Sequence, residues 1–176
     1  MKHLPTYTDL EVVAVEYLRG TGLGVVHRPQ LDVDTIRAPD GTPCAFPSGE
    51  DGRCLDDIDW QELGRWLGHL SAWIAYARHL VGVNGSIRVS AEAAGKQAES
   101  AAYMRSTSEK VTDRRADAAA EPLVARYREI AEEAHSRDRL LVGRLTGLEQ
   151  MYQAISREQS RREGEHRESG PTGRRV

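Results

Sequence analysis

The 176-residue sequence has very little cysteine and no long apolar run. Its two cysteines, Cys44 and Cys54, lie in a loop-rich stretch near His27, and the sequence contains neither a CxxC nor an HxxxH spacing. Zinc usually takes four ligands in closely spaced pairs, so no metal site is predicted. No run is apolar and long enough for a signal peptide or a membrane span, so we expect a cytoplasmic protein whose thiols stay reduced.

The sequence also lacks the motifs of common enzymes. No nucleophile has an adjacent base that the sequence identifies, and His69 and His79 fall on different faces of one helix. The glycines of "GTGLG" at 20–24 have neither a preceding strand nor a phosphate-loop lysine, so they predict a turn. We therefore expect no enzyme, no cofactor and no metal, with a triad assembled only in space as the open alternative. The start of the helix that follows can be capped by Asp56, Asp57 or Asp59.

Charge is unevenly placed along the chain. The net charge is -3, with 5 Lys and Arg against 11 Asp and Glu up to Trp60, and 19 against 16 after it. Any polyanion would therefore contact the second part of the chain, whereas a pI near 6.1 argues against broad nonspecific binding of nucleic acid.

The first 55 residues predict a small α+β segment. Thr8 or Asp9 is a possible N-cap of a helix that ends at Gly20, and β-prone runs flank a turn at 38–41. The stretch 43–57, rich in glycine, proline and acids, predicts a linker. The inner face of the first helix is expected to contain Val12, Val13, Tyr17 and Leu18.

Helical periodicity dominates from Asp59 onward. The glycines and asparagine of "VGVNGSIRV" at 81–89 predict either a kink or a reversal, and Pro122 places the start of the last helix near Glu121. The three tryptophans could stack on unpaired bases, but their helical spacing beside leucines predicts core positions. The expected inner residues of the middle helix are Trp60, Leu63, Trp66, Leu67, Leu70, Trp73, Ile74 and Ala77.

The last helix carries two heptad positions. Asp138 falls on one of them and must be paired, exposed at a break in the seam, or used to fix register. A lone helix cannot bury such a stripe, so the seam predicts a homo-oligomer. The first position holds Val124, Ala131, Leu145 and Tyr152, the second holds Tyr127, Ala134, Leu141, Leu148 and Ile155, and the predicted oligomer interface is Leu141, Leu145, Leu148, Tyr152 and Ile155.

Taken together, these patterns predict a mainly α protein, an elongated helical hairpin or coiled-coil-like bundle with a small N-terminal α+β segment. We expect residues 1–55 to form that segment with its acidic linker, 56–163 to form the helical oligomerisation and binding domain, and 164–176 to be a disordered tail.

The region from Trp60 to Arg162 resembles small helical phage proteins of the UvsY-type recombination mediator family. The likeness lies in "WLGHLSAWIAYARHL", "GKQAESAAYMRS" and "RDRLLVGRLTGLEQMYQAISREQSRR", and it covers about 100 of the 176 residues. It implies a non-enzymatic protein of the host cytoplasm that binds single-stranded DNA, forms a homo-oligomer and helps in DNA recombination and repair by loading a recombinase onto DNA coated with a single-strand binding protein.

In that family the basic middle segment contributes to DNA binding, which corresponds here to Lys96 and Arg105. Glu99, Ser100 and Ala102 stand where further basic residues would be expected, which moves the predicted DNA contact toward the last helix. Its candidate cations are Arg144, Arg157, Arg161 and Arg162. The alternative is a helical structural or assembly protein, such as a virion, scaffold or chaperone component, that binds protein only.

Overall fold

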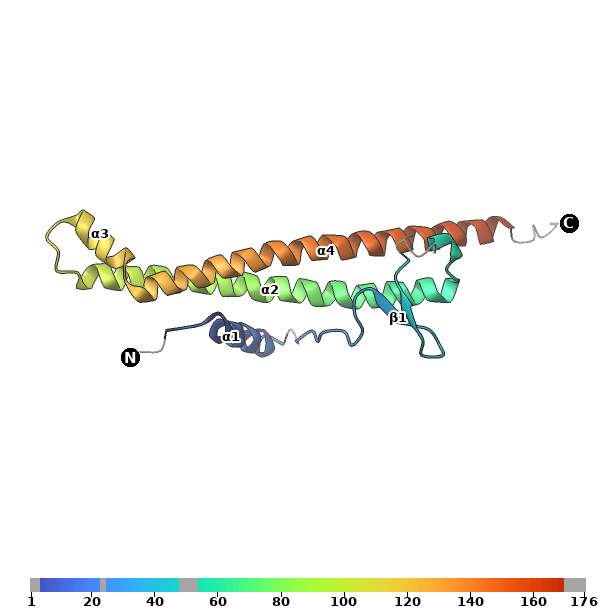
Figure 1. The fold of residues 1–176 in the computed structure, drawn as a ribbon, viewed down its shortest axis with the longest axis horizontal. Coiled ribbons are helices and arrows are strands. Elements are labelled where there is room, and N and C mark those ends of the chain that lie inside the picture. Colours follow the sequence, from blue (N-terminus) through green and yellow to red (C-terminus); the bar gives the residue numbers. More distant parts are fainter. Residues whose placement is uncertain (1–3, 23–24, 48–53, 170–176) are drawn as a thin grey trace. The chain divides into compact units, whose positions relative to one another are not determined.

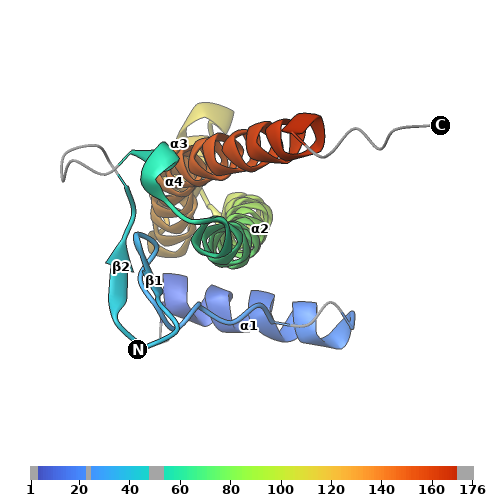
Figure 2. The same cartoon turned by 90° about the vertical axis from the view of Figure 1, so that its right-hand side faces the viewer.

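The computed structural model describes residues 4–22, 25–47 and 54–169. It is 76% helical, with a long helix pair and a small two-stranded sheet near the N-terminus, so the predicted mainly α fold is confirmed. Figures 1 and 2 show the pair, α2 and α4, lying side by side. The elements are α1 (Tyr7–Gly20), β1 (Thr35–Arg37), β2 (Pro43–Ala45), the 3-10 helix η1 (Leu55–Asp57), α2 (Trp60–Arg105), α3 (Val111–Ala119) and α4 (Pro122–Ser169).

The chain divides into two compact units, and each contains a segment of α2 and of α4. Unit 1 comprises Met1–Val26 and Ala77–Gly143, and unit 2 comprises His27–Tyr76 and Arg144–Val176. This division does not follow the boundary expected near residue 55. The N-terminal segment is shared between the two units because its side chains enter the cores that the helices build.

The core of unit 1 joins α1 to the helix pair. It contains Tyr7 and Ala14 from α1, Val83, Ile87 and Ala91 from α2, and Ile130 and Ala134 from α4. Alanines at 14, 91 and 134 leave no bulk between the helices, which lets the backbones approach closely.

The first helix begins at Tyr7, two residues earlier than expected, because neither Thr8 nor Asp9 is its N-cap. Thr6 is the N-cap, its hydroxyl accepts from the Asp9 backbone N–H at 3.2 Å, and the Asp9 carboxylate accepts from the Thr6 backbone N–H at 2.8 Å. This is a complete capping box. The predicted inner face was wrong at three positions, because the side chains that turn to solvent are Val12, Val13 and Tyr17, while Leu18 packs against the core.

Of the two alternatives for the run at 81–89, the reversal is wrong, because α2 continues through the run to Arg105. Asn84 is 2% exposed there; its Oδ1 accepts from the Tyr7 hydroxyl at 2.7 Å, and its Nδ2 donates to the Ala134 carbonyl at 2.6 Å. The Arg137 guanidinium lies 3.9 Å from the centre of the Tyr7 ring, and burial raises the pKa of the Tyr7 hydroxyl. One polar side chain thus ties α1, α2 and α4 together.

In unit 2 a β-hairpin packs on the first part of α2. Ile36 pairs with Cys44 across the antiparallel strands, and Gly41 takes a positive φ of 87° in the turn, as the predicted hairpin requires. The Phe46 ring lies edge-on to Trp66, with ring centres 5.0 Å apart. The expected linker at 43–57 therefore contains β2 and η1, and its residues 48–53 lie outside the described residues.

Most of the predicted inner face of α2 is confirmed. Trp73 is half-buried and its Nε1 donates to the Leu31 carbonyl at 3.1 Å, whereas Trp60 is 44% exposed and does not belong to the core. Leu67 is also half-buried. The buried positions are Leu63, Trp66, Leu70, Ile74 and Ala77, and the first three of them are fully buried.

Helix α4 begins at Pro122, as predicted, and buries both heptad positions unevenly. Asp138 is half-buried and so keeps contact with solvent. The helix continues past Gly164 to Ser169, which shortens the expected tail; residues 170–176 lie outside the described residues. The buried heptad residues are Val124, Ala134, Leu148 and Ile155, and the half-buried ones are Tyr127, Ala131, Leu141, Leu145 and Tyr152.

Candidate nucleic-acid interface

Arg162, a predicted DNA contact, is committed to the chain's own backbone in unit 2. Its Nη2 donates to the Leu55 carbonyl at 2.7 Å and to the Asp56 carbonyl at 3.0 Å, and its Nη1 donates to the Ile58 carbonyl. Its Nε donates to Glu158 at 2.5 Å. A guanidinium has five N–H donors, and four of them are used here, so little remains for a phosphate.

Arg161 is engaged as well. It donates to Glu158 at 2.7 and 2.9 Å, to Glu165 at 2.6 Å and to Asp56 at 3.0 Å. The hydrogen bonds from Arg161, followed by those from Arg162, lower the pKa of the Glu158 carboxyl, which is 9% exposed. In this structure the two arginines therefore have acceptors within the chain and join η1 to α4. We call Arg161, Arg162, Glu158 and η1 together the η1 latch.

The other predicted cations are distributed over both units. Arg144 and Arg157 are exposed on α4, with no ion pair to another described residue. Arg105 is exposed near the end of α2 and donates from Nε to the Ala101 carbonyl at 3.2 Å. Lys96 is also exposed and lies in a hollowed part of unit 1.

Two adjoining hollows of unit 1 share Lys96 and Glu99. The first, of about 210 Å³, lies between α2 and α4, and the second, of about 460 Å³, lies between α2 and α3. We call the two together the Lys96 groove. The residues that carry its chemistry are Lys96, Glu99, Ser100 and Tyr103 of α2, Arg115 of α3, and Tyr127 and Arg128 of α4.

Close helix packing gives the groove a firm wall. Tyr127 packs against the core of unit 1. A Cβ added at Gly95 would lie 3.4 Å from the Tyr127 Cβ, at van der Waals distance, so α2 and α4 lie close together here. The loop before α3 is also fixed, because the hydroxyls of Ser106 and Ser108 both donate to Asp117 at 2.7 Å.

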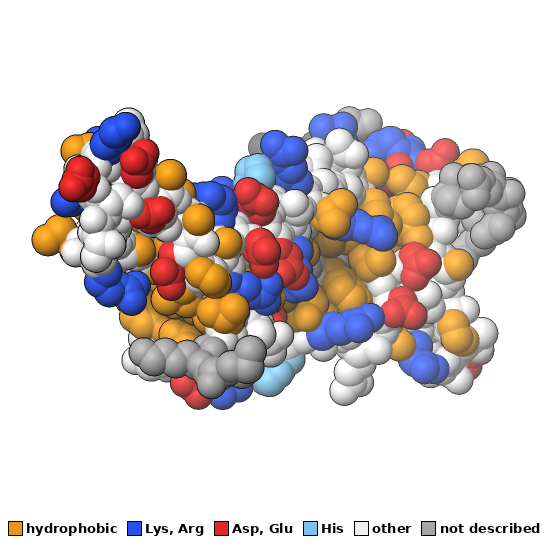
Figure 3. All heavy atoms as spheres, turned by 60° about the vertical axis from the view of Figure 1, so that its left-hand side comes forward, with side chains coloured by type: hydrophobic (Ala, Val, Ile, Leu, Met, Phe, Trp, Pro, Cys, Tyr) orange, Lys and Arg blue, Asp and Glu red, His pale blue; other side chains and the backbone are white. Residues whose placement is uncertain are grey.

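The cations of the groove are available in a way that those of the η1 latch are not. The three cations, Lys96, Arg115 and Arg128, are exposed. None of them forms an ion pair, with a nitrogen–oxygen distance of 4.0 Å or less, to another residue in the described part of the chain. Glu92, at one edge of the groove, lies 4.0 Å from Arg88. On the face shown in Figure 3, basic and acidic side chains are interspersed with apolar ones.

Of the three cations of the groove, only Lys96 was predicted from the sequence to bind DNA. Lys96, Ser100 and Tyr103 follow helical spacing, which is a signal that could have marked one face of α2. Arg115 and Arg128 come from other helices, and their approach depends on the turn at 106–110, which has no periodicity.

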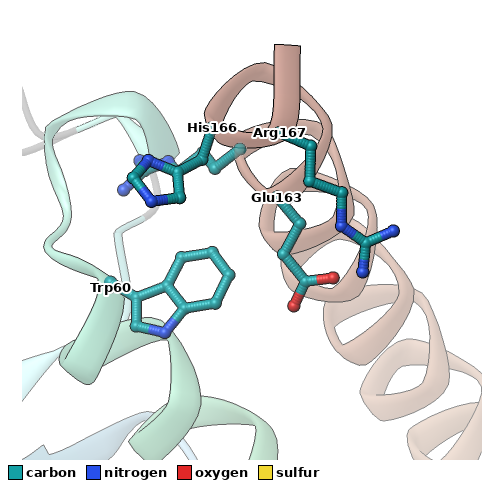
Figure 4. A pocket seen from close by; sticks show the side chains of 5 residues that line it. Trp60, Glu163, His166 and Arg167 are labelled. Carbon is teal, nitrogen blue, oxygen red and sulfur yellow. The ribbon is translucent and has the colours of Figure 1, made fainter. Parts of the chain in front are cut away.

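A third hollow, of about 520 Å³, lies in unit 2 beside the exposed Trp60. Figure 4 shows the indole facing His166 and Glu163 of α4, with Arg167 beside Glu163. Arg162 also lines this hollow but is held in the η1 latch. The side chains that line this hollow carry charges of both signs, so the hollow does not select a ligand of one charge.

Within the described residues, no group of three or more His, Cys, Asp or Glu side chains is placed to hold a metal ion, and Cys44 and Cys54 are free thiols. None of the helices that the structure describes is both long enough and apolar enough to cross a bilayer. Comparisons of the chain with protein-family models, with curated proteins and with solved structures find no match.

Proposed function

We propose that this protein binds single-stranded DNA without catalysis, as a homo-oligomer, and assists the loading of a recombinase in the presence of a single-strand binding protein. The observation that carries the proposal is the Lys96 groove, where exposed cations from three helices gather beside two tyrosines. The resemblance to UvsY-type mediators supports it, because Lys96 lies in the segment that corresponds to their DNA-binding region.

The groove has the two components that a flexible strand requires. Phosphates would contact Lys96, Arg115 and Arg128, and each contact releases counterions. Tyr103 and Tyr127 are half-buried and offer ring surface for unpaired bases, whose stacking contributes about 1–3 kcal/mol each. Three cations give modest affinity for one copy, and an oligomer that presents several grooves raises it through effective concentration.

The test measures binding of fluorescein-labelled dT20 by anisotropy as a function of salt. The variant is Lys96→Gln, Arg115→Gln and Arg128→Gln together. We expect weaker binding and a dependence of log K on log salt that is flatter by about 2, because each lost phosphate contact removes about 0.7.

A matched control removes the same charge outside the groove, by Arg19→Gln, Arg139→Gln and Arg157→Gln. These arginines are exposed, and Arg157 was predicted to bind DNA from the sequence. The control should keep the parent's salt slope. The proposal fails if the parent binds no dT20 at low salt. It also fails if both triple variants flatten the dependence of log K on log salt by the same amount.

The second candidate is a structural or assembly protein that binds protein only, and the outer face of α1 favours it. Val13 is 61% exposed and Tyr17 is 70% exposed one turn later. If the groove variant binds as the parent does, substitution of this face becomes the next experiment.

A further inference from the structure

The carboxylate at the centre of the Lys96 groove needs an explanation. Glu99 lines both hollows, lies between Lys96 and Tyr103 along α2, and is half-buried. No ion pair within 4.0 Å joins it to any described cation. If the groove holds a DNA backbone, this carboxylate repels any phosphate placed directly beside it.

A carboxylate is compatible with a bound strand where it faces hydrogen-bond donors. Ionised Glu accepts only, through two oxygens. Phosphates and sugar ring oxygens offer it no donor, whereas base edges carry N–H groups. A strand in this groove must therefore place its phosphates toward Lys96, Arg115 and Arg128. It must also turn the edge of a base toward Glu99.

The four bases differ in what they offer. Guanine presents an imino N–H and an amino group side by side, which matches both oxygens of a carboxylate. Cytosine and adenine present one amino group beside an acceptor nitrogen, and thymine presents one N–H between two carbonyl oxygens. Only guanine gives two parallel charge-assisted hydrogen bonds, the arrangement that combines strength with geometric selectivity.

We infer that Glu99 is a specificity-determining residue, which makes the Lys96 groove prefer unpaired guanine. This inference rests on the proposed function, since it concerns the same groove and the same strand. Tyr103, one helical turn after Glu99, supplies the ring against which the selected base stacks.

The experiment uses the full chain and a set of fluorescein-labelled 18-mers. One oligomer is all thymine, and in each of the others every third base is replaced by guanine, hypoxanthine, cytosine or adenine. Isolated guanines prevent quadruplex formation, and hypoxanthine lacks only the amino group of guanine. We expect the guanine oligomer to bind roughly tenfold more tightly than the hypoxanthine and all-thymine oligomers.

The variant is Glu99→Gln, and Glu132→Gln is the matched control on the exposed surface of α4 in the same unit. Glu99→Gln should bring the guanine and hypoxanthine oligomers to within twofold of each other and bind the all-thymine oligomer more tightly than the parent does. Glu132→Gln should keep the parent's guanine preference. Circular dichroism confirms that both variants are folded.

The outcomes separate this inference from the proposed function. If all oligomers bind the parent equally, or if Glu99→Gln keeps the guanine preference, the inference is overturned while DNA binding stands. If the parent binds no oligomer at low salt, both are overturned.

Discussion

The side chain of Asn84, on α2, forms hydrogen bonds to both of the other helices that build the core of unit 1. It is buried and accepts from the Tyr7 hydroxyl while donating to the Ala134 carbonyl. Asn84→Ala leaves the Tyr7 hydroxyl buried without this partner, which should lower the free energy of unfolding by about 1–3 kcal/mol.

Urea denaturation followed by circular dichroism measures this change. Ser90→Ala, on the exposed side of the same helix, should alter the free energy of unfolding by no more than about 0.5 kcal/mol. An Asn84→Ala midpoint equal to that of Ser90→Ala would show that the Tyr7 hydroxyl is not held as the structure describes.

Single residues were the hardest feature to predict from the sequence. Asn84 stands in a run whose glycines favour a break, yet α2 passes through because the asparagine amide is satisfied by partners 77 and 50 residues away. Local propensity cannot report such partners. Trp66 and Leu70 were predictable because their burial follows from periodicity alone.

At the scale of elements, the η1 latch gives the end of α4 a structural role. Arg162 donates to three carbonyls of the 55–58 segment and to the nearly buried Glu158. Arg162→Gln should lower the free energy of unfolding by about 1.5–3 kcal/mol, the range for hydrogen bonds to charged groups. Hydrogen exchange of the peptide that covers 54–60 should accelerate.

The control is Arg157→Gln, at an exposed position five residues earlier on the same helix, which should leave both readouts unchanged. The latch also has a pH signature. Because the folded pKa of Glu158 is lowered from 4.5, its contribution is present above pH 4.5 and is lost as pH falls through the lower folded pKa. A difference between parent and Arg162→Gln that is as large at pH 3 as at pH 7 would contradict the role of Glu158.

The elements show which physical signals the sequence carries. The hairpin was predictable from Pro39 and Gly41, and the start of α4 from Pro122, because these residues restrict the backbone locally. The inner face of α1 was not, because Val13 and Tyr17 form as good an apolar stripe as Tyr7 and Ala14 do. Only the shape of the helix pair decides between them.

At the scale of the whole molecule, the two units explain why the predicted domain boundary differs from the structure. Tyr7 enters the core of unit 1, and Phe46 packs on Trp66 in unit 2. These pairings join segments far apart in sequence, which composition and charge cannot indicate. The prediction of a mainly α fold is nevertheless confirmed, because it depends only on the helical periodicity after Asp59.

The seam of α4 bears on self-association. Leu148 and Ile155 are 8% and 0% exposed within one chain, so intramolecular packing already covers them. Leu145 and Tyr152 of unit 2 are half-buried, so part of their apolar surface stays accessible. The seam therefore contains residues that the chain's own fold buries and residues that it leaves partly exposed.

These two groups predict different responses to substitution. Leu148→Ala should lower the free energy of unfolding by about 2–5 kcal/mol, because it opens a cavity in the chain's own core.

Leu145→Gln with Tyr152→Gln should instead leave a folded chain that sediments as a monomer, whereas the parent should show a sedimentation coefficient that rises with protein concentration. Circular dichroism at equal concentration establishes that the double variant is folded. A parent that sediments as a well-folded monomer at every concentration, or a double variant that associates as the parent does, would remove the seam as an oligomer interface, and several grooves could then no longer act on one strand through it.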